Sequence, residues 1–165
     1  MARSYAGVRP ALFALLREAG VPSEEWLAWC GGSPEMLAGA VEYFGEAGEP
    51  GELAHSARLL AMLGPGRAPA FWRDSLKRAC SRLVRNGEGA AAREVWNALV
   101  ARGALPYEPI GAGNLIGNPG FADPLDGEGF NWRFRPLPGV SRIFDAQARR
   151  VRVRFDENLF RLLKN

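Results

Sequence analysis

The sequence changes character abruptly after Gly103. The residues before it are rich in Ala, Leu, Glu and Arg, which favour α-helix. Residues 113–134, "GNLIGNPGFADPLDGEGFNWRF", are instead rich in Gly, Asn, Pro and aromatic residues, which favour turns and short strands. One regular fold does not accommodate both compositions, so the sequence predicts a domain boundary between the two parts.

Two stretches just before this boundary carry apolar residues at helical spacing. Asn86-Gly87 separates them and tolerates the left-handed backbone of a helix C-cap. Gly103, followed by Pro106, ends the second stretch. Two helices of this length joined by so short a turn pack antiparallel. The two apolar stripes are Trp72, Leu76, Ala79, Cys80 and Leu83, and then Ala92, Val95, Trp96, Leu99 and Val100.

The same plan occurs upstream. Ser33, with Pro34 after it, is a helix N-terminal signal, and Gly48 closes that helix. A second helix follows and stops at 64–66, and a more degenerate pair precedes both. Repetition of helix, glycine turn and helix indicates a helical repeat array. Here the stripes are Leu37, Ala40, Val41 and Phe44, and then Leu53, Ala57, Leu60 and Leu63.

The pair at 73–106 resembles a tetratricopeptide repeat. In that family, large residues alternate with small ones where the two helices touch, and a proline closes the repeat. Residues of the required size stand at five positions, whereas Leu99 is larger than usual and Pro106 comes late. The pair at 34–65 resembles the family less closely, with Val41 and Leu53 in place of small residues. The matching residues are Leu76, Cys80, Leu83, Ala92 and Trp96 in one pair, and Leu37, Phe44, Ala57 and Pro65 in the other.

The second part contains four β-like stretches, at 114–116, 130–136, 140–145 and 149–155. The last alternates most cleanly, so it would place its arginines on one face and its apolar residues on the other. Residues 111–165 carry 9 basic and 6 acidic residues, whereas residues 1–110 carry 12 of each. A solvated outer face is the favoured interpretation, and polyanion binding by the Arg149–Arg154 stretch is the alternative. The two faces are Arg150, Arg152 and Arg154, and then Val151, Val153 and Phe155.

This part resembles the opening of jelly-roll modules related to carbohydrate-binding domains. Helical repeats followed by such a module are similar to bacterial tetratricopeptide proteins of surface-polysaccharide or export systems. The resemblance implies that Leu115 and Phe121 are core anchors, that Asn118 forms a turn and that Trp132 lies in a strand. The residues that carry it are Asn114, Leu115, Asn118, Phe121, Asp123 and Trp132.

A jelly roll has eight strands, and only three or four fit after Asn114. The predicted fold is therefore mainly α, with tetratricopeptide-like antiparallel hairpins over 1–104, a linker over 105–113 and a partial β-sandwich over 114–165. We expect a truncated fragment of a longer protein. Residues 156–165 carry a Leu/Phe run suited to covering the exposed apolar face of an incomplete sheet.

Groups for catalysis are scarce in this sequence. His55 is the single histidine, and Cys30 and Cys80 form no CxxC pair, so zinc-site and nucleophile–base patterns are missing. We expect no enzyme, no metal and no cofactor, and we expect both cysteines to be buried free thiols. Neither a signal peptide nor an apolar run of about 18 residues occurs. The default expectation is a cytoplasmic protein, while the family resemblance implies association with the cell envelope.

The leading functional hypothesis is a non-catalytic scaffold that binds a protein or peptide in a groove formed by the first helix of each pair. The alternative is glycan binding through Trp132, since exposed aromatic rings stack on sugars. Phe130 and Phe134 would share its face on a strand, and burial of that face in a sandwich is favoured over sugar stacking. By repeat position, the groove residues are Glu35, Glu42, Glu46, Asp74, Lys77, Ser81 and Arg85.

Overall fold

The structure is a computed structural model that describes residues 8–30, 32–63, 70–111, 113–121, 126–134, 136–145 and 147–155. These residues form six helices and a two-stranded antiparallel sheet. The prediction of a mainly helical chain with a short β segment is confirmed. The elements are α1 Val8–Glu18, α2 Ser23–Cys30, α3 Pro34–Ala47, α4 Pro50–Leu63, α5 Ala70–Arg85, α6 Gly89–Ala101, β1 Val140–Asp145 and β2 Arg150–Phe155.

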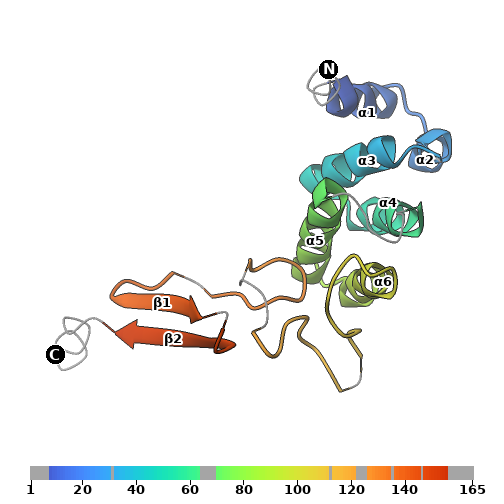
Figure 1. The fold of residues 1–165 in the computed structure, drawn as a ribbon. Helices are drawn as coiled ribbons and strands as arrows, with labels where there is room; N and C mark the ends of the chain where they lie inside the picture. The colour runs from blue at the N-terminus through green and yellow to red at the C-terminus, as the bar shows by residue number, and fades with distance from the viewer. Residues whose placement is uncertain are drawn as a thin grey trace.

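The helices form consecutive pairs that stack in one direction. Figure 1 shows the first helices α1, α3 and α5 following one another on one side, with α2, α4 and α6 on the other. The β hairpin projects away from the end of the stack at which α5 and α6 lie (Figure 1). The arrangement is that of a helical repeat array, in which each pair contacts its neighbours.

The predicted helix ends form for the expected local reasons. Ser33 has extended backbone, and its hydroxyl accepts a hydrogen bond from the Met36 amide at 3.3 Å, with Pro34 in the first turn. Gly48 has φ 75° and donates its N–H to the Phe44 carbonyl. A side chain at Gly48 would be strained, because φ is positive.

The core follows the predicted stripes closely. Every stripe residue of α3 and α5 is buried, and so are Ala92, Val95, Trp96 and Leu99 of α6. Leu63 is a wrong prediction, since 40% of it is exposed at the last residue of α4. At the N-terminal end an aromatic cluster joins α1 and α2 to α3, with ring centroids 5.0–5.9 Å apart. Its members are Phe13, Trp26, Tyr43 and Phe44.

After α6 the chain folds back onto the helices. Leu105 and Ile110 are buried in the helical core. The Asn97 side chain of α6 donates to the Ile110 carbonyl at 2.9 Å and accepts from the Ile110 amide at 2.7 Å. This double hydrogen bond satisfies a backbone that has no regular structure of its own. The expected domain boundaries at 104 and 113 remain a prediction.

The sheet confirms two of the four β-like stretches. Its register pairs Val140 with Phe155 and Asp145 with Arg150. Because directly opposed residues share a face, the three arginines of β2 lie on one face with Ser141, Ile143 and Asp145, as the alternation predicted.

The other two β-like stretches were wrong predictions. Residues 114–116 contribute only an isolated bridge between Asn114 and Gly111. Residues 130–134 form no strand, because Phe130 packs against the helical core while Trp132 stacks on other aromatic rings. The expected cover of the sheet by residues 156–165 lies outside the described residues.

Candidate functional site

Trp96 is the anchor between the helices and the segment that follows them. Its side chain is fully buried on α6. Tyr107 stacks on the ring at 5.8 Å and Phe130 meets it edge-on at 5.6 Å. A Cβ atom added at Gly117 or Gly129 would lie less than 3 Å from the same ring. Only glycine permits this close approach, so Tyr107, Gly117, Gly129 and Phe130 together cover the Trp96 ring at the end of the helical stack.

This cover meets a general need of repeat proteins. The last unit of an array has no neighbour to cover its apolar face, so a terminal cap is required. Here the cap consists of irregular chain rather than a further helix. It buries Leu105, Ile110 and one side of Trp96.

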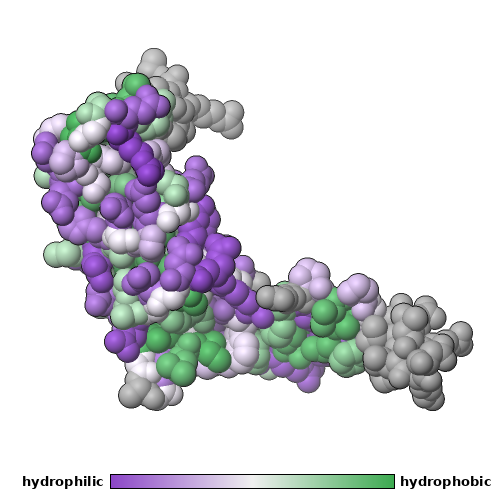
Figure 2. Space-filling view, turned by 180° about the vertical axis from the view of Figure 1, so that it is seen from behind, coloured by the Kyte–Doolittle hydropathy of each residue, from purple (hydrophilic) through white to green (hydrophobic). Residues whose placement is uncertain are grey.

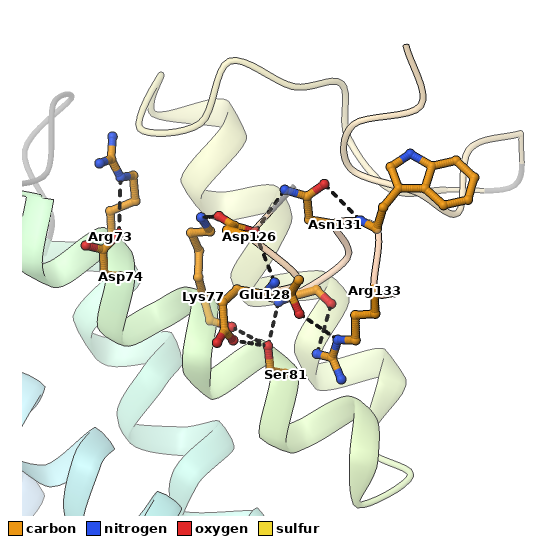
Figure 3. A network of polar contacts seen from close by, with 11 residues as sticks. Arg73, Asp74, Lys77, Ser81, Asp126, Glu128, Asn131 and Arg133 are labelled. Atoms are coloured by element: carbon orange, nitrogen blue, oxygen red, sulfur yellow. Dashed lines mark hydrogen bonds and ion pairs between the residues drawn. The ribbon is translucent and has the colours of Figure 1, made fainter. Parts of the chain in front are cut away.

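Residues 126–131 lie along α5, over the predicted groove (Figure 3). Lys77 forms an ion pair with Asp126. The Ser81 hydroxyl accepts the Gly129 N–H at 2.6 Å and lies 2.5 Å from Glu128 Oε2, to which it can donate. Lys77 and Ser81 are two of the predicted groove residues. At α5, therefore, the chain's own segment occupies the face predicted to take a partner.

The segment has a conformation suited to this contact. Asp126 Oδ1 accepts hydrogen bonds from the Glu128 amide at 3.0 Å and from Asn131 Nδ2 at 2.9 Å. Gly127 and Gly129 have φ of 71° and 58°, where other residues are strained. The Asp-Gly-Glu-Gly sequence thus builds a tight turn that presents two carboxylates to α5.

Asp126 makes this contact dependent on pH. Partial burial acts to raise the pKa of its carboxyl, but hydrogen bonds from Lys77 and the Glu128 amide, with the Lys77 charge, lower it below the usual value. A carboxyl with a lowered pKa in the folded state stabilises that state above its unfolded pKa of about 4, and the stabilisation is lost as pH falls through the folded pKa.

We therefore expect the turn to loosen as pH falls below about 4. The measurement is the chemical shift and exchange rate of the Gly129 amide between pH 6 and pH 2.5. Asp126→Asn should remove the part of this change that belongs to the turn. An identical profile in wild type and Asp126→Asn would contradict the assignment.

Ser81→Ala is expected to weaken the contact from the α5 side. The substitution leaves the buried Gly129 N–H without its acceptor, a change that costs about 1–3 kcal/mol. Urea unfolding measures the loss, and faster exchange of the Gly129 amide locates it. Ser141→Ala, at an exposed position of β1, is the control and should change neither quantity.

The rest of the predicted groove is divided between ion pairs and exposed charge. Glu42 lies 2.6 Å from Arg78 and 3.6 Å from Arg82, so it joins α3 to α5. Arg85 donates to the Ser81 carbonyl at 3.3 Å. Asp74 lies 3.6 Å from its neighbour Arg73. Exposed positions on α3 are Glu35 and Glu46.

The structure thus brings Lys77, Ser81 and Arg85 together on α5 and ties Glu42 to that helix. It leaves Glu35 and Glu46 facing solvent. Arg78 and Arg82, which bind Glu42, are not among the residues predicted from the sequence. Their contact with Glu42 could be predicted only if α3 were known to pack beside α5. The one signal in the sequence was the excess of arginine on α5.

Trp132 is half-buried, and both its indole N–H and its ring face make contacts. Its Nε1 donates to the Asn118 carbonyl at 2.8 Å. Phe121 and Phe134 stack with its ring at 5.1 and 6.3 Å. The expected strand position of Trp132 is wrong, and so is the expected core role of Leu115, which is 75% exposed.

A cavity of about 570 Å³ lies between this aromatic cluster and the sheet. It combines apolar walls with one acidic and one basic side chain. Its main lining residues are Asp126, Trp132, Phe134, Arg142, Phe144 and Val151.

Reactive groups do not converge within the part of the chain that the structure describes. No group of three His, Cys, Asp or Glu side chains there is placed to hold a metal ion. Cys30 and Cys80 are buried free thiols, as predicted. Burial raises the pKa of both and brings that of Cys80 to about 12, so Cys80 is protonated at neutral pH and a poor nucleophile. Across the described ranges, no helix has the length and apolarity that crossing a membrane requires.

Comparison of the chain with protein-family models, with curated proteins and with solved structures finds no match in any of the three.

Proposed function

We propose that the chain is a non-catalytic protein-interaction module built from tetratricopeptide-like helical hairpins. The observation that carries the proposal is the seating of residues 126–131 on α5. A face that holds one irregular polypeptide segment by an ion pair and a hydroxyl has the chemistry to hold another.

The partner is expected on the part of this face that the chain does not fill. Lys77 and Ser81 are engaged by Asp126, Glu128 and Gly129. Two exposed carboxylates on α3 are Glu46 and Glu35, the latter of which accepts a hydrogen bond from the Ser33 hydroxyl at 3.2 Å. Complementary charge sets orientation and speeds encounter, so the fitting partner carries basic residues.

Charge reversal on α3 tests the proposal. Glu35→Lys with Glu46→Lys should lower the affinity of a partner, captured from the source cell and then purified, by at least tenfold in calorimetric titration. Glu88→Lys with Glu108→Lys changes the net charge equally at exposed positions outside α3. If the control variant weakens binding as much as the α3 variant does, the proposed binding site on α3 is wrong. Lys77 is unsuitable for this test because it holds the chain's own turn.

A glycan-binding role is the second candidate, and the cavity beside Trp132 favours it. Aromatic rings there stand next to Asp126 and Arg142, and sugars combine apolar ring faces with hydroxyls that such groups bind. Phe134→Ala is the informative variant, because Trp132 also holds Phe121 and Asn118 in place. Loss of a glycan-array signal in the folded Phe134→Ala protein would support this role, and the absence of any wild-type signal would reject it.

A further inference from the structure

The β hairpin carries the feature that the groove proposal leaves unexplained. It projects away from the helices (Figure 1) and has two strands in the part of the chain that the structure describes. Two-stranded hairpins are marginally stable in water. Apolar residues gather on the projecting arm (Figure 2), and Val153 is 45% exposed there. An exposed strand edge with apolar side chains is a template for pairing with another chain.

We propose that the outer edge of β2 binds an extended segment of a partner protein in which acidic residues alternate with apolar ones. This site is separate from the surface around Glu35 and Glu46 of α3 to which the first proposal assigns a partner. It would extend the sheet to three strands by β-augmentation, in which backbone hydrogen bonds hold the added strand and alternate side chains select it.

The outer edge of β2 is more open than that of β1, because the chain that leads into β1 runs along the outer side of that strand (Figure 1). Arg142 of β1 lies over the Phe134 ring at 5.2 Å, and Leu137 bridges to Val140 at the start of β1. The chain that leads into β1 therefore runs close to that strand. Within the described ranges, β2 is paired with β1 alone, and no strand lies on its other side from Val151 to Arg154.

Charge selects the partner. Asp145 Oδ2 lies 3.4 Å from Arg150 and 3.3 Å from Arg152, so one carboxylate serves two arginines. Arg154 has no carboxylate partner among the described residues. Every second side chain of an added strand would lie on the same face of the sheet as Arg150, Arg152 and Arg154. Acidic residues there would be favourable cross-strand partners of the arginines.

The remaining side chains of the added strand would lie on the opposite face of the sheet, beside the valines of β2. Val151 and Val153 point away from the three arginines of β2, because successive side chains of a strand alternate. Apolar residues between the acidic ones would lie beside them. A single-stranded nucleic acid could neutralise the arginines, but it would neither pair with the backbone edge nor cover the valines.

A second copy of this chain fits poorly. Two β2 strands paired with their apolar faces on the same side would bring arginine opposite arginine, which is destabilising. The alternative register sets arginine beside valine and turns one apolar face over. An acidic strand has neither fault.

The experiment measures binding of fluorescein-labelled peptides to the full chain by anisotropy. The probe peptide repeats Glu-Val three times. One control has the same composition with the three glutamates together, and another has the probe sequence with N-methyl groups on the amides that would donate to β2. We expect the probe to bind at least tenfold more tightly than either control. Equal binding of the N-methylated peptide would overturn the proposal, because that peptide keeps the charge and lacks the donors.

Protein variants separate the arginine face from general charge. Arg152→Glu with Arg154→Glu should weaken probe binding at least tenfold, whereas Arg93→Glu, exposed on α6, should not. Peptide binding should also slow the hydrogen exchange of those β2 backbone amides that point to the outer edge. A labelled DNA strand that binds more tightly than the probe, with steep salt dependence, would assign the arginines to polyanions. A dimer in sedimentation that excludes the probe would assign the edge to a second copy. Either result would overturn the proposal.

Discussion

Trp96→Ala is expected to lower the free energy of unfolding by about 3–5 kcal/mol, the cost typical of removing a large buried aromatic side chain. The ring is fully buried and is the contact shared by α6, Tyr107 and Phe130. Urea unfolding followed by circular dichroism measures the change.

Trp29→Ala is the matched control for this substitution. Trp29 is 67% exposed on α2, so its removal is expected to change stability by no more than about 0.5 kcal/mol. Trp96→Ala should also make residues 113–121 accessible to protease under native conditions, because the ring that holds them is gone. Similar losses from the two substitutions would contradict the proposed position of Trp96.

Gly129→Ala is expected to have the second largest effect. The added methyl group would overlap the Trp96 ring, and φ at this residue is 58°. Overpacking costs about 1–3 kcal/mol, and a left-handed backbone costs a residue with a Cβ about 1–2 kcal/mol more. Thermal and urea unfolding measure the sum.

Two further glycines separate these contributions. Gly117 also faces the Trp96 ring but has no positive φ, so Gly117→Ala should show the packing cost alone. A Cβ at Gly113 would meet no atom within 4 Å, and Gly113→Ala should be nearly neutral. Equal stability of the Gly113 and Gly129 variants would show that the segment does not lie against Trp96.

The helical part was predictable because its determinants are local. Ser33, Pro34 and Gly48 fix the ends of α3 through contacts within four residues. Apolar spacing in α5 and α6 identifies the face that each must bury. The arginine and valine alternation of β2 predicted a strand by the same kind of local argument, with a period of two.

The failures concern contacts between residues far apart in the chain. Phe130, Trp132 and Phe134 alternate as a strand would, yet Phe130 is drawn to Trp96 on α6, which breaks the alternation. Lys77 was predicted to face a partner protein, but it pairs with Asp126, which lies 49 residues later in the same chain. The sequence offered charge complementarity between them and no register that would bring them together.

The glycines have two roles, and only the first could be predicted from the sequence. Their number after Gly103 correctly indicated turns, and Gly127 and Gly129 do have positive φ. Nothing in the sequence indicated that Gly117 and Gly129 are also required for close packing against one tryptophan. That second role depends on tertiary structure, which composition does not encode.

The central claim is that residues 126–131 lie along α5 and that Gly117 and Gly129 pack against Trp96. The most direct test is a nuclear Overhauser measurement between the Trp96 indole protons and the α protons of Gly117 and Gly129 in the intact chain. We predict strong cross-peaks to both glycines, with upfield shifts from the ring current. Random-coil shifts for these glycines, without cross-peaks to Trp96, would contradict the claim.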